Sequence, residues 1–145
     1  MKAGSRTIPS ELDQTTIEAY RSARYRIDGR FDLIVDRSST ELGAWHAAHG
    51  RSCSALITAY NPGGCICSNL DNQVANRRLA DIIGKTGLPF LFTVGLDPEG
   101  QWPPEPGFLI AGLERDSAEE LGRRFGQNAI VWSGADAVPC LLLLR

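Results

Sequence analysis

Short apolar runs and amphipathic segments follow one another in an order that limits the fold more than any other feature. From Ser54 onward the sequence predicts a strand, a helix, two strands, a helix, a strand and one more strand. The first six elements have the split βαβ order of ferredoxin-like sheets. We therefore predict an α+β fold in which a mixed β-sheet has a ferredoxin-like core and carries its helices mostly on one face. A doubly wound α/β sheet is the alternative, because a right-handed crossover from the first strand to the second fits either design.

The N-terminal part of the chain is expected to add a helix, a hairpin and a second helix to this core. Ser10 can cap the first helix, and Asp28-Gly29 lies between two β-favouring runs as a hairpin turn signal. The second helix should run from Ser38 to Gly50. The length of 145 residues fits one hydrophobic core. We predict a single domain over residues 1–145, with an N-terminal helical extension over 1–24 and the main domain over 25–145.

A buried strand over residues 54–60 ends in a glycine loop, Asn61-Pro62-Gly63-Gly64, and a helix should begin soon after, near Asp71. A strand end, a glycine loop and a helix N-terminus together form a corner where anions and other ligands bind in many α/β proteins. The loop lacks the Gly-Lys-Ser/Thr of a phosphate loop. An ordinary turn without a ligand is therefore an equally good interpretation.

Two asparagines of the predicted helix bear on this choice. Asn72 and Asn76 project in nearly the same direction as the core-facing Leu79 and Ile83. Buried amides need hydrogen-bond partners. We expect both side chains to face inward near Asn61, where they would bond either the loop backbone or a ligand.

The proline-rich connection over residues 95–107 should be extended and stiff around Trp102-Pro103-Pro104-Glu105-Pro106. Such a segment fixes the position of Glu105, and long loops in compact domains are often lids or binding loops. The other interpretation is a rigid edge connection with an exposed glutamate.

Composition excludes several classes of function. The net charge of -2 and the pI of about 5.7 provide no basic field, so we predict no general nucleic-acid binding. Nothing resembles a secretory signal or a membrane span, and the cytoplasm is the expected location.

Without an export signal the cysteines should be thiols. A zinc site built from the Cys65–Cys67 pair, His46 and His49 is conceivable, but we predict no metal and no cofactor, because the two segments need not be close.

Three stretches resemble the pattern of a bacterial family known as domain of unknown function 3293. They are Thr58-Ala59-Tyr60-Asn61-Pro62, Trp102-Pro103-Pro104-Glu105-Pro106-Gly107-Phe108 and Phe125-Gly126-Gln127-Asn128-Ala129-Ile130-Val131-Trp132, with Asn72 and Asn76 between the first two. The resemblance covers roughly residues 25–145 and implies no activity. This sequence departs from the family at Cys65-Ile66-Cys67, where polar residues other than cysteine are usual, which argues against a metal role for that pair.

The polar residues of these motifs form the candidate site. Glu105 is the candidate catalytic residue, and the candidate ligand-binding residues are Thr58, Asn61, Asn72, Asn76 and Gln127. Amides suit recognition of an adenine-like edge or a carboxamide, and no Ser-His-Asp or Cys-His set is apparent. The favoured function is a module that binds a small molecule or nucleotide. The alternatives are an enzyme with Glu105 as acid or base on a nucleotide-like ligand, and a protein-interaction domain whose motifs only maintain the fold.

Overall fold

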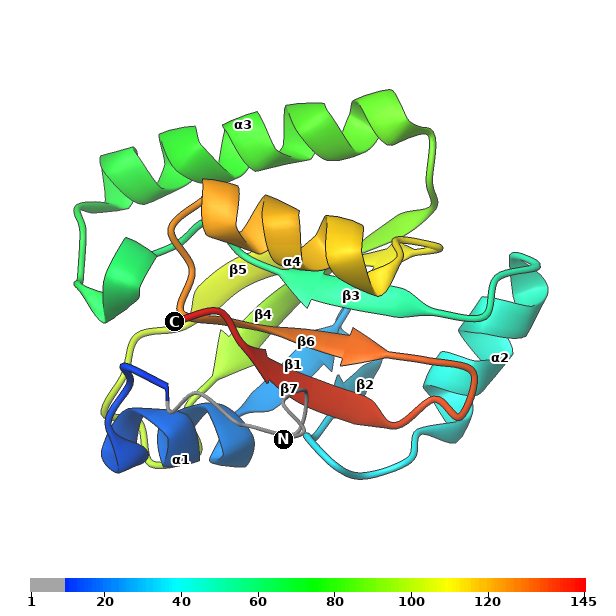
Figure 1. The fold of residues 1–145 in the computed structure, drawn as a ribbon, viewed down its shortest axis with the longest axis horizontal. Coiled ribbons are helices and arrows are strands. Elements are labelled where there is room, and N and C mark those ends of the chain that lie inside the picture. Colours follow the sequence, from blue (N-terminus) through cyan, green and yellow to red (C-terminus); the bar gives the residue numbers. More distant parts are fainter. Residues whose placement is uncertain (1–9) are drawn as a thin grey trace, which may run out of the picture.

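Seven strands form one sheet in the computed structural model, which describes residues 10–145 (Figure 1). The neighbours run β2-β1-β4-β5-β3-β6-β7, and every pair is antiparallel. The elements are α1 (Gln14–Ser22), β1 (Arg24–Ile27), β2 (Phe31–Leu33), α2 (Thr40–Ala48), β3 (Ser54–Ile57), the 3₁₀ turn η2 (Pro62–Gly64), α3 (Asn69–Thr86), β4 (Phe90–Leu96), β5 (Glu105–Ala111), α4 (Arg115–Arg124), β6 (Ala129–Ser133) and β7 (Pro139–Leu143). None of these helices combines the length and the apolar character that crossing a membrane requires.

The predicted α+β class is confirmed, whereas the predicted mixed sheet and the doubly wound alternative are wrong. The physical reason lies in the two helical crossovers. The connection through α3 joins β3 to β4, but β5 occupies the place between them; the connection through α4 joins β5 to β6, but β3 lies between those two. Strands that run in the same direction are therefore never neighbours, and the sheet is antiparallel throughout.

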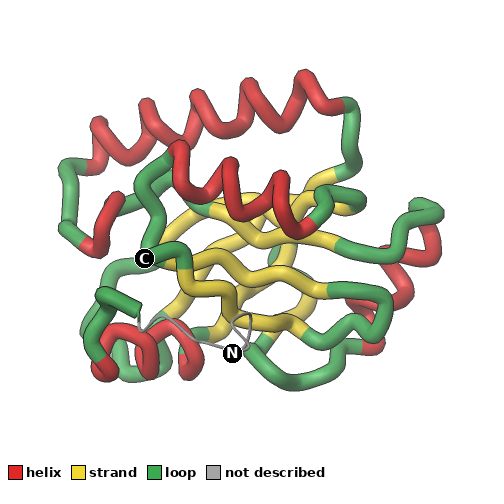
Figure 2. The backbone as a smooth tube through the Cα atoms, viewed as in Figure 1, coloured by secondary structure: helices red, strands yellow, loops and turns green. Residues whose placement is uncertain are grey.

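The sheet is curled, and its two faces are covered differently (Figure 2). Helices α3 and α4 pack on one face over the central strands, where Ile57, Leu79, Ile110 and Ile130 belong to one buried cluster. On the opposite face, Leu42 of α2 joins a second cluster contributed by β1, β2, β3, β5 and β6. Helix α1 lies toward the other end of that second face (Figure 1). The prediction of helices mostly on one face is therefore wrong, since α1 and α2 occupy the second face.

The added N-terminal elements extend the sheet as predicted. Asp28 and Gly29 both have positive φ, 51° and 67°, which fits the expected tight hairpin between β1 and β2. Strand β1 then pairs with β4 and so joins the hairpin to the central strands. Helix α1 is capped by Asp13 and not by Ser10. The first nine residues of the extension predicted over 1–24 lie outside the described residues.

Three boundaries near the candidate site differ from the prediction. Strand β3 ends at Ile57 instead of residue 60, and α3 begins at Asn69 with Ser68 as its cap. Glu105 is the first residue of β5, paired with Gly95 of β4, and is not part of a loop. The proline-rich connection is shorter than expected, because the antiparallel pairing of β4 with β5 continues to Glu105.

Candidate functional site

A cleft of about 600 Å³ lies between α1 and the second face of the sheet. Its apolar floor comes from strands β3, β6 and β7, with Leu56, Val131 and Leu141 among the lining residues. Polar and aromatic side chains from several elements complete the lining, including Tyr20, Tyr25, Thr58, Tyr60, Trp102 and Glu105. The cleft therefore has the volume and mixed lining of a small-molecule site.

The Asn61 loop forms one wall of this cleft, and the Asn61 side chain holds it in shape. Asn61 has left-handed backbone angles, φ 49° and ψ 60°, which asparagine tolerates better than most residues. Its Oδ1 accepts hydrogen bonds from the Cys67 N–H and from Asn72 Nδ2, each at 2.9 Å. Its Nδ2 donates to Glu105 Oε2 at 2.8 Å. One buried amide thus joins the loop, helix α3 and strand β5.

Asn72 and Asn76 face inward near Asn61, as predicted from their phase on the helix. Asn72 Oδ1 accepts a hydrogen bond from the Asn61 N–H at 2.9 Å, and Asn76 Oδ1 accepts one from the Ala59 N–H at 3.2 Å. These two backbone N–H groups follow the end of β3, where the sheet no longer provides partners. The asparagines thus supply the hydrogen bonds that the strand loses when it leaves the sheet.

Thr58 and Gln127 also bond the backbone around the cleft. Thr58 Oγ1 donates to the Pro106 carbonyl at 2.6 Å and accepts from the Tyr60 N–H at 3.1 Å. Gln127 Nε2 donates to the Tyr60 carbonyl at 3.2 Å and to the Phe125 carbonyl at 3.3 Å. Both residues therefore connect the segment after β3 to neighbouring parts of the chain.

Among residues 10–145, hydrogen bonds reach only one of the two carboxylate oxygens of Glu105. Its Oε2 accepts hydrogen bonds from Asn61 Nδ2 and from Trp102 Nε1, both at 2.8 Å. Its Oε1 accepts none from residues 10–145. The carboxylate is half-buried and lines the cleft. Residues 10–145 thus hold Glu105 by one oxygen and provide no hydrogen bond to the other.

Gly95 brings Glu105 close to Tyr25. The register places Tyr25, Gly95 and Glu105 side by side on β1, β4 and β5, so they share one face of the sheet. Gly95 has no side chain to fill the space, and a Cβ atom there would lie 3.6 Å from the Tyr25 ring. The Tyr25 ring therefore lies over Gly95, next to Glu105.

Two tyrosines and an asparagine complete the site, and none of the three was among the predicted residues. Tyr25 Oη donates to the Tyr20 carbonyl at 3.1 Å, and Asn128 Nδ2 donates to Tyr20 Oη at 3.1 Å. Burial raises the pKa of both tyrosines, and the nearby charge of Glu105 adds to the effect. Both hydroxyls are therefore protonated at neutral pH, and no acceptor for the Tyr20 hydroxyl proton is found among residues 10–145. Asn128, next to Gln127 in a motif segment, was the only one of the three with a sequence signal.

The predicted site residues divide into two groups by position. Thr58, Asn61, Glu105 and Gln127 line the cleft, while Asn72 and Asn76 lie behind it and contact the Asn61 loop. The predicted set thus comes together in one place, with the asparagines of α3 supporting the residues at the cleft surface.

The histidines and cysteines lie in separate settings. His46 is buried on α2, and its Nε2 is 2.8 Å from Ser54 Oγ. Cys65 and Cys67 belong to the loop before α3, and all four cysteines are free. Within residues 10–145, no group of three or more His, Cys, Asp or Glu side chains is placed to hold a metal ion.

His46 should make the stability of the protein depend on pH. Burial lowers the pKa of His46 below its ordinary value of 6.5. At a pH between these two values, His46 is protonated in the unfolded chain and neutral in the folded chain. The contribution of neutral His46 to the free energy of unfolding should be fully present above about pH 6.5 and be lost as the pH falls through the lowered pKa. The free energy of unfolding should change by at most about 1.4 kcal/mol per pH unit, because one proton is involved. Urea unfolding between pH 5 and pH 8 measures it. The pH dependence of the free energy of unfolding should be smaller in His46→Gln and unchanged in His49→Gln. The prediction would be contradicted if wild type and His46→Gln showed the same pH dependence.

Comparison with known proteins yields one match. A family model described as "Protein of unknown function (DUF3293)" matches residues 57–130. The matched segment contains the Asn61 loop, Glu105 and Gln127, whereas α1 lies outside it. No curated protein and no solved structure matches the chain. The family resemblance drawn from the sequence motifs is thereby confirmed.

Proposed function

Since this chain belongs to the DUF3293 family, whose description names no activity, we propose a function from the site itself: the cleft beneath α1 binds a small organic molecule. The observation that carries this proposal is the Glu105 carboxylate. Two side chains fix one of its oxygens inside the cleft, and the other has no partner among residues 10–145. A half-buried acceptor that is held in place but left unsatisfied is suited to a ligand.

The other predicted site residues take two roles in this proposal. Thr58, Asn61 and Gln127 form the wall beside Glu105, and a ligand in the cleft would lie against them. Asn72 and Asn76 act through the Asn61 loop and are positioning residues. This division follows from the hydrogen bonds, because the side-chain oxygens of both helix residues are directed at backbone N–H groups of the segment 59–61.

The second candidate function is an acid–base reaction on the bound molecule, with Glu105 as the proton acceptor. Glu105 Oε1, which has no partner among residues 10–145, and the Tyr20 hydroxyl, which can donate its proton, both belong to residues that line the cleft. A carboxylate and a phenol in one cleft can remove and return a proton. Incubation of each bound compound with the protein, followed by mass spectrometry for a changed product, separates this candidate from simple binding.

We also propose that the cleft lies on the open face of a ferredoxin-like unit. The element order β3-α3-β4-β5-α4-β6 and the spatial order β4-β5-β3-β6 support this interpretation. In such a unit both crossover helices cover one face of the sheet. The other face is then free for a ligand, and α1 and α2 cover only parts of it here (Figure 1).

Blocking the cleft should abolish binding. Ala19 is an exposed residue of α1 that lines the cleft, and Ala44 is an exposed residue of α2 that does not. In a fragment screen by ligand-observed NMR, Ala19→Trp should weaken hits about tenfold or more, because the indole would occupy ligand volume, while Ala44→Trp should leave them unchanged. Hits that bind wild type and both variants equally, or a complete lack of hits, would contradict the proposal.

A further inference from the structure

We infer that the cleft selects an organic cation, with an ammonium or guanidinium group placed against Glu105 and an apolar body on the sheet. This inference rests on the proposed small-molecule function and specifies its ligand class. Three independent features support it: the charge of the lining, the hydrogen bonding of its carboxylates and the aromatic walls.

Among the described residues, the charged side chains that line the cleft all carry the same sign. Four carboxylates line the cleft, and no Lys, Arg or His does so in the part of the chain that the structure describes. The four are Glu11, Asp13, Asp97 and Glu105. Concave surfaces that carry one sign of charge concentrate ligands of the opposite sign. A nucleotide, considered from the sequence, would place its phosphates among these carboxylates without a basic partner, so the lining disfavours it.

Hydrogen bonding shows which of these carboxylates is available. Asp97 bonds the N–H groups of its own turn, at Glu99, Gln101 and Trp102, and Asp13 bonds the Thr16 N–H as the cap of α1. Backbone N–H groups therefore satisfy part of the Asp97 and Asp13 carboxylates; Asp97 is half-buried, whereas Asp13 is exposed, as is Glu11, the remaining carboxylate. Glu105 is half-buried and keeps one oxygen free of partners among the described residues. It is the natural counter-ion for a cation inside the cleft.

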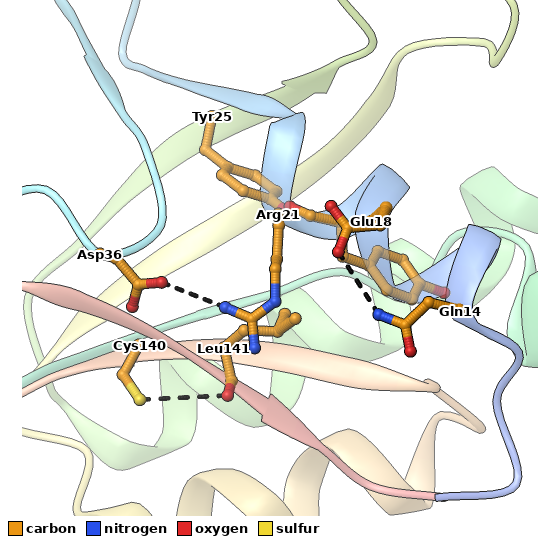
Figure 3. Close-up of polar contacts among 8 residues, drawn as sticks. Gln14, Glu18, Arg21, Tyr25, Asp36, Cys140 and Leu141 are labelled. Atoms are coloured by element: carbon orange, nitrogen blue, oxygen red, sulfur yellow. Dashed lines mark hydrogen bonds and ion pairs between the residues drawn. The ribbon is translucent and has the colours of Figure 1, made fainter.

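Two arginines near this region, Arg21 and Arg145, contact groups other than Glu105. Arg21 belongs to α1 and forms an ion pair with Asp36, with an Nη1 to Oδ2 distance of 3.1 Å (Figure 3). Arg145 contacts a residue of the wall, since its Nη1 donates to Asn128 Oδ1 at 3.4 Å. Neither residue lines the cleft.

Aromatic side chains provide the rest of the environment that an organic cation prefers. Trp102 donates to the carboxylate through Nε1, and Tyr25 lies beside it over Gly95. Tyr20 and Tyr60 add two further rings to the lining. Aromatic faces attract ammonium and guanidinium groups, and the attraction grows when water is excluded. The floor of Leu56, Val131 and Leu141 would contact the apolar part of the same ligand.

The test uses three probes of one shape and different charge: phenethylamine, 2-phenylethanol and phenylacetate. Binding to the full chain is measured by NMR titration at neutral pH. We expect the amine to bind at least about tenfold more tightly than the alcohol or the acid, as expected for a charge-assisted hydrogen bond. Glu105→Gln should remove this preference while the weak affinity for the alcohol stays. The control Glu99→Gln, at an exposed residue outside the lining, should leave all three affinities unchanged.

The outcomes separate this inference from the proposed function. If the alcohol or the acid binds as well as the amine, in a manner that Ala19→Trp blocks, the cleft is a small-molecule site and the cation inference is overturned. If none of the three probes binds at millimolar concentration, the cation inference is also overturned, and the fragment screen alone decides the proposed function. A preference for the amine that Glu105→Gln leaves intact would assign the charge recognition to another residue and overturn the role of Glu105.

Discussion

Asn61→Ala should lower the free energy of unfolding by about 3–5 kcal/mol and abolish ligand binding in the cleft. The substitution removes the acceptor of the Cys67 N–H and of Asn72 Nδ2, and it removes the donor to Glu105. Each buried polar group left without a partner costs about 1–3 kcal/mol. Alanine also tolerates the left-handed backbone poorly, at a cost of about 1–2 kcal/mol. Urea unfolding at pH 7 measures the loss.

A second substitution at the same position separates loop stability from the placement of Glu105. Asn61→Asp keeps an acceptor for the Cys67 N–H and for Asn72, but it directs a second carboxylate at Glu105 Oε2 instead of a donor. Asn61→Asp should therefore reduce the affinity of the cleft for a ligand by more, in free energy, than it reduces the free energy of unfolding. Asn69→Ala, at an exposed asparagine of α3, is the control and should change the unfolding free energy by less than about 1 kcal/mol. If Asn61→Ala behaved like this control, the Asn61 loop would not be held as described.

Gly107→Ala should destabilise the protein by about 2–4 kcal/mol, although it adds only one methyl group. A Cβ atom at Gly107 would lie 2.8 Å from the Ile57 carbonyl oxygen, 3.1 Å from Thr58 Cβ and 3.2 Å from Thr93 Oγ1. The Ile57 carbonyl oxygen is a backbone atom in the centre of the sheet, so it cannot move away by a side-chain rotation. Thr58 leaves β3 at this point to begin the wall of the cleft, so a displaced Thr58 should also weaken ligand binding.

A glycine in open space provides the matched control. Gly84 lies within α3, and no heavy atom lies within 4 Å of a Cβ placed there. Gly84→Ala should therefore stabilise the protein by about 0.5–1 kcal/mol through the better helix propensity of alanine. Thermal and urea unfolding of the two variants should thus give opposite signs. Equal and small effects would show that β5 and β3 can separate at Gly107 without cost.

Local patterns in the sequence predicted the elements and one half of the site. The phase of Asn72 and Asn76 with the apolar residues of α3 indicated that they face inward, and the structure places them against the Asn61 loop. The turn residues Asp28 and Gly29 likewise predicted the hairpin. These inferences succeeded because they depend on residues a few positions apart, whose relative directions are fixed by the helix or the turn.

The other half of the site depends on pairings between distant strands, which no local pattern encodes. Tyr25 lies beside Glu105 only because β1 joins β4 and because Gly95 leaves the space between them empty. Tyr20 belongs to α1, and no residue of this helix is fully buried, so no buried helix face in the sequence pointed to Tyr20. Glu105 looked like a loop residue because prolines surround it, yet the pairing with Gly95 makes it the start of a strand. Register thus decides which side chains meet, and register is set by the whole sheet.

Helix α1 has no fully buried residue, although it forms one wall of the cleft. The residues that would hold a ligand belong to the sheet and its connections, while side-chain hydrogen bonds link the helix above them to Tyr25, Asn128 and Asp36. Elements with little buried area open at low free-energy cost. The association rate of a ligand would then depend on the fluctuations of this helix, and its residence time on the fixed carboxylate below. Substitutions along α1 and substitutions at Glu105 should accordingly act on different kinetic constants.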